Sequence, residues 1–263
     1  MRVSAFIATV ALVLLSPPGT ASALSLLSQT RDVDAYAALT PFFQAPIVDE
    51  HTESAPDFGP FAGAVTATMS GPGRTDSSAT QDSSIAAGSG DSLDTSASGR
   101  VEAGAFHNNR GADDFASRGS SSYLLTFEVT SDEAYELVAM ATVVTSSSGS
   151  ADASATTRIE LVRDGGEVIE QLLLTAPAGG SDSDAFDHSG VLTPATYSLR
   201  VDSSATGGAF RNLSPGAPSS NADGHVDYDV TLRLLPEPGA LALLSLALLA
   251  LWISRPGQAL SGG

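Results

Sequence analysis

The sequence contains no cysteine and no lysine, and it has one tryptophan among its 263 residues. Without cysteine, the chain can form no disulfide framework, no thiolate metal site and no cysteine nucleophile. Its 12 basic residues, all arginine, stand against 30 acidic ones, which gives a formal net charge of −18. A surface this acidic repels phosphate backbones, so the composition argues against a nucleic-acid partner. The hydrophobic share of 42% is nevertheless enough for a sizeable core.

The sequence also lacks the motifs that carry common enzyme chemistry. Four histidines, His51, His107, His188 and His225, are scattered without the spacing of a helical metal site, and no HExxH motif is present. A G-x-S-x-G elbow and a phosphate-binding glycine loop are absent as well. Paired carboxylates that hydrolyse glycosides meet only in the folded chain, so an enzyme acting on polysaccharide stays open as a third alternative. We expect no catalytic residues and no enzymatic activity.

The first 23 residues have the three parts of a secretory signal peptide. Arg2 supplies the positive charge, residues 5–15 form a short apolar run, and Ala21 and Ala23 frame a small-x-small cleavage site. The alternative is an N-terminal anchor helix, but the apolar run is shorter than the roughly 20 residues that span a bilayer. We therefore expect signal peptidase to cleave after Ala23 and the chain to be exported.

The other end of the chain has an equally distinct order of elements. Pro236, Glu237 and Pro238 precede an uncharged Leu/Ala-rich run at residues 240–253, and Arg255 follows this run. The two prolines predict the end of the folded domain, because proline continues neither a helix nor a central strand. The apolar run predicts a short transmembrane helix at about residues 239–254. By the positive-inside rule, Arg255 stays cytoplasmic and the preceding domain lies outside.

This C-terminal segment, residues 236–263, resembles the PEP-CTERM sorting signal of Gram-negative bacteria. The resemblance implies that an exosortase, a membrane protease-transpeptidase, recognises Pro236, Glu237 and Pro238 and removes or exchanges the tail beside them. It also implies an association with exopolysaccharide, a transient stay in the inner membrane, and a final place at the cell surface or in the extracellular matrix. The alternative is a plain C-terminal anchor in which the triplet has no role.

Between the two signals, the sequence alternates between apolar and polar residues with a period of two, which is typical of strands with one buried face. The pattern is clear at residues 123–129, 197–201 and 226–234, whereas residues 135–145 are apolar on both faces, as in a central strand. An Asp-Gly pair at Asp164 and Gly165, between two such runs, predicts a hairpin. The fold class predicted is all-β, an antiparallel β-sandwich that is jelly-roll-like, in residues 24–235.

The two halves of this domain differ in how strongly they are patterned. Residues 115–235 alternate well, whereas residues 24–114 are rich in Ser, Gly and Ala, and residues 70–99 have the composition of a linker. Weak alternation persists at residues 62–69, 79–86 and 100–106. In many proteins with the PEP-CTERM signal, such a half pairs into the same sandwich. We favour one domain over a disordered arm followed by a small sandwich.

Two acidic clusters, residues 181–187 and 221–229, place several oxygens close together, as Ca²⁺ prefers. In the second, Asp227 and Asp229 share the polar face of a strand, and we expect Asp223 to join them across a turn as a weak calcium site. The alternative is a solvated acidic loop that keeps a sheet edge soluble. No other metal or cofactor is expected.

The favoured function is therefore that of an exported, non-enzymatic surface or matrix protein, sorted by an exosortase and associated with exopolysaccharide. The second candidate is a carbohydrate-binding module, with or without Ca²⁺. The tyrosines of the strands fall on core faces, so sugar binding would depend on hydrogen bonds from Asp, Asn and Arg rather than on aromatic stacking.

Overall fold

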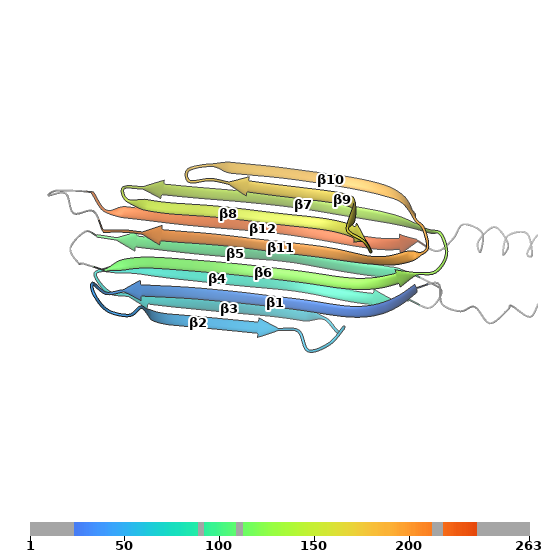
Figure 1. Cartoon of the computed structure of the whole chain (residues 1–263), viewed down its shortest axis with the longest axis horizontal. Helices are drawn as coiled ribbons and strands as arrows, with labels where there is room; N and C mark the ends of the chain where they lie inside the picture. The colour runs from blue at the N-terminus through green and yellow to red at the C-terminus, as the bar shows by residue number, and fades with distance from the viewer. Residues whose placement is uncertain (1–23, 89–91, 109–112, 212–217, 236–263) are drawn as a thin grey trace, which may run out of the picture.

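The computed structural model describes residues 24–88, 92–108, 113–211 and 218–235. These residues form twelve strands in two antiparallel six-stranded sheets that pack face to face as a sandwich (Figure 1). The prediction of an all-β antiparallel sandwich is confirmed. The expected signal peptide and C-terminal segment lie outside the described residues. Within the described ranges, no helix is long and apolar enough to cross a membrane.

Each sheet mixes strands from both halves of the chain. The first sheet has the order β2 (Ile47–Ser54), β1 (Leu24–Thr40), β6 (Asp114–Val129), β11 (Ala195–Ala209), β8 (Ala151–Arg163) and β9 (Glu167–Ala176). The second sheet has the order β10 (Ser181–Leu192), β7 (Glu133–Ser148), β12 (Ser220–Leu235), β5 (Leu93–His107), β4 (Gly73–Ala87) and β3 (Phe61–Ser70). The Ser/Gly/Ala-rich half therefore supplies five strands, β1–β5, to both layers.

Both ends of the described domain lie at the same end of the sandwich. Leu24 pairs with Val129 at the end of β6, and Leu235 pairs with Ala134 at the start of β7. Because β6 leads directly into β7, the two chain ends flank a single connection (Figure 1). We call this end of the sandwich the terminal end. The connections β3–β4, β5–β6 and β11–β12 lie at the opposite end, which we call the far end.

The expected hairpin is confirmed between β8 and β9. Gly165 and Gly166 have φ angles of 92° and 88°, which favour glycine over any residue with a side chain. The Asp164 carboxylate accepts a hydrogen bond of 2.9 Å from the Gly165 N–H and holds the turn. The connection from β10 to β11 contains Pro194, just ahead of β11.

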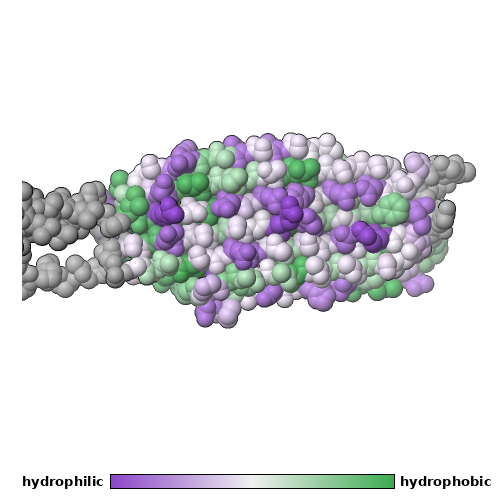
Figure 2. Space-filling view, turned by 180° about the vertical axis from the view of Figure 1, so that it is seen from behind, coloured by the Kyte–Doolittle hydropathy of each residue, from purple (hydrophilic) through white to green (hydrophobic). Residues whose placement is uncertain are grey.

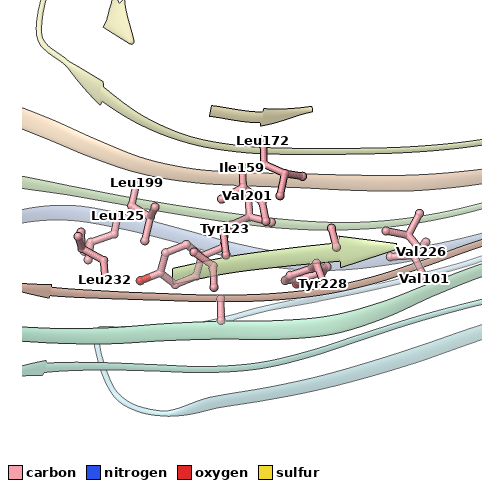
Figure 3. Close-up of a cluster of buried hydrophobic side chains, with 14 of the residues drawn as sticks. Val101, Tyr123, Leu125, Ile159, Leu172, Leu199, Val201, Val226, Tyr228 and Leu232 are labelled. Carbon is pink, nitrogen blue, oxygen red and sulfur yellow. The ribbon is translucent and has the colours of Figure 1, made fainter. Parts of the chain in front are cut away.

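The core follows the alternation read from the sequence. Tyr123, Tyr135, Tyr197 and Tyr228 are all buried, as their positions on the apolar faces predict. Their neighbours from both sheets form a continuous apolar layer (Figure 3): Val101, Leu125, Ile159, Leu172, Leu199, Val201, Val226 and Leu232. Burial raises the pKa of Tyr123 to about 12 and that of Tyr228 to about 12, so both hydroxyls stay neutral hydrogen-bonding groups.

Residues 135–145 lie in β7, which is an inner strand of its sheet between β10 and β12, as predicted. Only one of its two apolar faces is covered. Val138, Met140 and Val144 on the outer face are exposed, with Met140 57% exposed. The reason is architectural: a sandwich has only two layers, so the outer face of each strand has no further sheet above it.

Towards the far end, the two sheets come so close that some positions between them have no room for a side chain. A Cβ on Gly119 of β6 would lie 2.8 Å from the Ser78 carbonyl oxygen and 2.9 Å from the Glu102 carbonyl oxygen, both in the second sheet. Gly224 of β12 similarly faces the Ser154 carbonyl oxygen of the first sheet at 2.8 Å. Only a hydrogen atom fits at these positions, so the glycines set the separation of the sheets.

Buried hydroxyl groups near these glycines join the two layers. The Ser77 hydroxyl of β4 donates to the Tyr36 carbonyl oxygen of β1 at 2.9 Å. The Thr75 hydroxyl of the same strand lies 3.0 Å from the Ala116 carbonyl oxygen of β6. A buried hydroxyl is tolerated when it is hydrogen-bonded, which explains how a Ser-rich stretch can line a core.

We predict that Gly119→Val lowers the free energy of unfolding by about 3 kcal/mol, because the added side chain would overlap backbone atoms that cannot rotate away. The matched control is Ser120→Val, on the outer face of the same strand, where the change should stay within about 0.5 kcal/mol. Valine favours strands, so intrinsic propensity alone predicts the opposite sign at position 119. Urea unfolding of both variants measures the difference, and equal midpoints would refute the close approach.

Candidate ligand-binding groove

A shallow groove lies on the outer face of the second sheet, over its four central strands β4, β5, β12 and β7. Its volume is about 440 Å³. Figure 2 views the molecule from the side of this sheet and shows a surface of mixed character, with hydrophilic side chains between weakly polar and hydrophobic ones. The groove is lined by Thr80, Asp82, Ser98, Gly99, Arg100, Met140, Ala141, Thr142, Asp227, Tyr228 and Asp229.

Strand register builds the polar part of the groove from two parallel rows. In one row, Asp82, Ser98 and Asp229 are direct neighbours on β4, β5 and β12. In the other, Arg100 stands between Thr80 and Asp227 on the same three strands. Neighbouring strands lie about 4.8 Å apart, so the Cα atoms of Asp82 and Asp229 are separated by about 10 Å across Ser98.

The row through Arg100 is held by a bidentate ion pair. Arg100 Nε lies 2.9 Å from Asp227 Oδ1, and Arg100 Nη2 lies 3.3 Å from Asp227 Oδ2. His225 Nε2 lies 2.6 Å from the same Oδ2, and Glu102 Oε1 lies 3.4 Å from His225 Nδ1. The guanidinium of β5 and the carboxylate of β12 therefore meet through two N–H···O bonds, the bidentate geometry that favours Arg–carboxylate pairs.

This ion pair shifts the titration of both partners. Hydrogen bonding from Arg100 lowers the pKa of Asp227 below its ordinary value, with a smaller contribution from His225. The same hydrogen bond raises the pKa of Arg100. Near neutral pH, Asp227 is therefore a carboxylate and Arg100 is a cation. The pair joins β5 and β12 and presents two fixed charges at the groove.

The other row offers unoccupied acceptors. Asp82 and Asp229 are exposed, and within the described ranges neither makes an ion pair or a side-chain hydrogen bond. The Ser98 hydroxyl lies between them, and exposed Met140 adjoins Asp229 on β7. Two carboxylates, flanking hydroxyl groups and one apolar side chain can accept and donate hydrogen bonds to a neutral polyhydroxylated ligand. They repel an anionic one.

The predicted convergence of Asp223 with Asp227 and Asp229 is wrong. All three lie in the single strand β12, on its outer face, with no turn between them. Asp223 and Asp229 are six residues apart along an extended strand, which is about 20 Å. Asp223 instead accepts hydrogen bonds from Asn221 and, at 3.3 Å, from Ser146. Among the residues that the structure describes, no group of three or more His, Asp or Glu side chains is arranged to hold a metal ion.

The physical reason for this error lies in one glycine. The pair Asp223-Gly224 has the composition of a turn, since glycine often supplies the positive φ that a turn needs. Gly224 instead lies within strand β12, where its missing side chain allows the first sheet to approach closely. The other acidic cluster, residues 181–187, likewise lies in a strand, the edge strand β10, rather than in a loop.

Sequence reasoning missed Asp82, Ser98 and Arg100. They belong to the Ser/Gly/Ala-rich half, where alternation is weak, and Arg100 is 127 residues away from Asp227 in the chain. The only usable signal was their even spacing, which places them on one face if the segment is a strand. The sorting residues Ala21, Ala23, Pro236, Glu237, Pro238 and Arg255 lie outside the described ranges, so their roles stay predictions.

We predict that Arg100→Gln raises the pKa of Asp227 towards the ordinary Asp value, because the hydrogen bond from Arg100 is the largest cause of its lowering. A carboxyl group whose pKa is lower in the folded state than in the unfolded state stabilises the fold at pH values above its unfolded-state pKa. This stabilisation is lost as the pH falls through the folded-state pKa. Both side chains are about half exposed, so the loss is under about 1 kcal/mol.

Nuclear magnetic resonance titration of the Asp227 side-chain carbon checks this prediction. The control is Arg233→Gln on the same face of β12, whose partners are Asp94 and Glu136. It should leave the titration of Asp227 unchanged. A titration midpoint that is the same in wild type and Arg100→Gln would contradict the assigned ion pair.

Comparison with known proteins gives no relative by sequence: no protein family and no curated protein matches the chain. Among solved structures, one of the infectious bursal disease virus Gx strain is 8% identical, covers 83% of this chain and 68% of its own, and has a TM-score of 0.18. The enzymatically active domain of bacteriophage CBA120 tailspike protein 4 is 10% identical, covers 50% of this chain and 18% of its own, and has a TM-score of 0.15. TM-scores this low do not establish a shared fold, and no function is transferred from these proteins.

Proposed function

We propose that this chain is an exported, non-enzymatic protein of the cell surface or extracellular matrix. Signal peptidase cleaves it after Ala23, and the apolar run near residues 239–254 holds it transiently in the inner membrane. An exosortase then recognises Pro236, Glu237 and Pro238 and releases the domain, which becomes associated with exopolysaccharide. The observation that best supports this proposal is the position of Leu24 and Leu235 at the same end of the sandwich.

That position matters because the segments before Leu24 and after Leu235 then meet the domain on one side. A membrane anchor on either segment would attach the sandwich to the bilayer through its terminal end. The far end would then point away from the bilayer. Leu235 is still paired in register with Ala134 of β7, and the proposed recognition triplet begins at the next residue. An exosortase could therefore reach the triplet without unfolding the last strand.

We also infer that the architecture is that of a jelly roll. Strands β5–β12 are divided between the two layers in the orders β5–β12–β7–β10 and β6–β11–β8–β9, with β3–β4 and β1–β2 added at one side. This is the arrangement of two interlocked Greek keys, found in capsid, lectin and cupin domains. Folds of this kind support many functions, so the proposal depends on the sorting signals and on the groove.

Replacing Pro236, Glu237 and Pro238 with Ala should trap the full-length chain in the inner-membrane fraction. The variant keeps the apolar run, so its membrane affinity persists while recognition is lost. Wild type should reach the surface or medium with its tail shortened. A matched control replaces Pro256, Gly257 and Gln258, which lie beyond the apolar run, and it should behave as wild type.

Fractionation followed by mass spectrometry reads this experiment directly. Equal distribution of the triplet variant and wild type would show that the triplet is not recognised. Released wild-type protein that still contains Trp252 and Arg255 would show that no cleavage occurs. Either outcome would favour a plain anchor or a simple secreted protein.

A second candidate function is carbohydrate binding in the groove of the second sheet. The observation that favours it is the pair of exposed, unpaired carboxylates, Asp82 and Asp229, about 10 Å apart across the Ser98 hydroxyl. The groove would bind a neutral glycan through hydrogen bonds, without aromatic stacking. The negative charge of the domain opposes acidic glycans.

We predict that the double variant Asp82→Ala, Asp229→Ala binds neutral glycan about tenfold or more weakly, because hydrogen bonds to charged groups contribute about 1.5–3 kcal/mol each. The control removes Glu128 and Asp152, two exposed carboxylates on the first sheet, and should bind as wild type. A glycan array followed by calorimetry, with and without a calcium chelator, measures the effect. Absence of binding to any glycan would exclude this candidate.

A further inference from the structure

A second hollow adjoins the groove on the outer face of the second sheet, and its volume is about 340 Å³. Asp82 and Ser98 line both the groove and this hollow. From these two residues, the groove extends over β12 and β7, whereas the hollow extends past Ser84 and Ser96 to Pro60 at the start of β3. Because they share two residues, the groove and the hollow form one continuous depression.

The depression follows a row of residues that crosses the whole sheet, with one residue from each of its six strands. Both edge strands, β3 and β10, contribute an exposed alanine, so no large side chain of this sheet stands at either end of the row. Neighbouring strands lie about 4.8 Å apart, so the row is about 24 Å long. From β3 to β10, it consists of Ala62, Asp82, Ser98, Asp229, Met140 and Ala185.

Ion pairs border this row on both sides along the strand direction. Towards the far end, Arg100 pairs with Asp227 at 2.9 Å. Towards the terminal end, Arg233 lies 3.6 Å from Asp94 and 3.7 Å from Glu136. Among the described residues of β4, β5, β12 and β7, no outward side chain between these two sets makes an ion pair. A band therefore crosses the sheet with hydroxyl groups, two carboxylates and apolar side chains but no cation.

The part of the band inside the second hollow is lined with hydroxyl groups. Ser84 on β4 and Ser96 on β5 face each other in register, and their hydroxyl oxygens lie 3.0 Å apart. A hydroxyl group has one donor and two acceptor sites, so this pair can still form hydrogen bonds with a ligand. The neighbouring Asp82 adds a carboxylate acceptor. These groups suit a neutral ligand rich in hydroxyl groups, whereas an acidic ligand would find no cation in the band.

The shape of the depression favours a long ligand over a small one. Pockets for small molecules gain affinity by burying most of the ligand surface. The groove and the hollow lie on the outer face of a sheet, so they can cover only one side of a sugar ring. A ligand covered on one side must gain further contacts along its length to offset the cost of binding.

We propose that the depression binds an internal segment of a linear, neutral polysaccharide that runs across the strands from β3 to β10. This inference rests on the carbohydrate-binding function proposed for the groove, and it adds the class of glycan and a second subsite in the hollow. The direction across the strands follows from the ion pairs that border the band. An internal segment is bound because the row ends in Ala62 and Ala185, past which the polysaccharide can continue.

The test measures binding of cello-, laminari- and manno-oligosaccharides by calorimetry, each as a disaccharide and as a hexasaccharide. The full chain is kept in a zwitterionic detergent, because a detergent with sugar head groups would compete. Wild type should bind the hexasaccharide of the preferred series about tenfold or more tightly than the disaccharide, since only the longer chain reaches both subsites. A soluble polymer of the same linkage should compete with the hexasaccharide, because binding needs no chain end.

Ser84→Ala with Ser96→Ala should weaken hexasaccharide binding about tenfold and leave disaccharide binding unchanged, because these hydroxyl groups line the hollow but not the groove. The matched control is Thr156→Val with Ser204→Ala. It removes a hydroxyl pair with the same 3.0 Å separation from the outer face of the first sheet, and it should bind both lengths as wild type does.

Several outcomes would overturn the inference and leave carbohydrate binding in the groove intact. They are equal affinity of wild type for both lengths, failure of the polymer to compete, equal weakening of both lengths by the serine variant, and equal weakening by the control. Binding to none of these oligosaccharides would also overturn it, whereas the carbohydrate function itself fails only if the glycan array is negative too. If circular dichroism shows that the serine variant is misfolded, the length comparison and the competition on wild type still decide.

Discussion

The fold depends on how closely the two sheets approach one another at the glycines of β6, β11 and β12. A Cβ on Gly119, Gly207 or Gly224 would lie 2.8–3.1 Å from a carbonyl oxygen of the facing sheet. This constraint explains the composition, because alanine, serine and threonine face inward where the layers are close. The hydroxyl groups of Ser77 and Thr75 donate hydrogen bonds to backbone carbonyl oxygens of the facing sheet. Larger side chains concentrate around Tyr123 and Ile159 (Figure 3).

Because the core is thin, most charged side chains lie on the outside of the sandwich, and some of them have specific structural contacts there. On the outer face of the second sheet, Arg100 and Asp227 join two strands, while Asp82 and Asp229 remain available to a ligand. At the sheet edges, Asp49 and Glu53 cap the backbone of β3. Acidic side chains therefore position strands and protect sheet edges.

The sequence predicted the architecture where inward and outward residues differ in polarity. Residues 226–234 alternate strongly, so both the strand and its buried face could be identified. In β4, Ser77 faces the core and Ser78 faces solvent. The sequence alone does not distinguish these two serines. What distinguishes Ser77 is its hydrogen bond to the Tyr36 carbonyl oxygen in the other sheet. The groove was missed for a related reason: strand pairing brings Arg100 to Asp227, and a single strand does not encode its neighbour.

The proposed function joins an acidic sandwich to two expected sorting signals, one before Leu24 and one after Leu235 in the chain. Its central claim is that an exosortase processes the tail and releases the domain. The most direct measurement is the mass of the chain in cells with and without a working exosortase. The account predicts a released species that begins at Leu24 and lacks residues 239–254 only when the enzyme is present. Release of the same species without the enzyme, or of a chain that retains its tail, would contradict it.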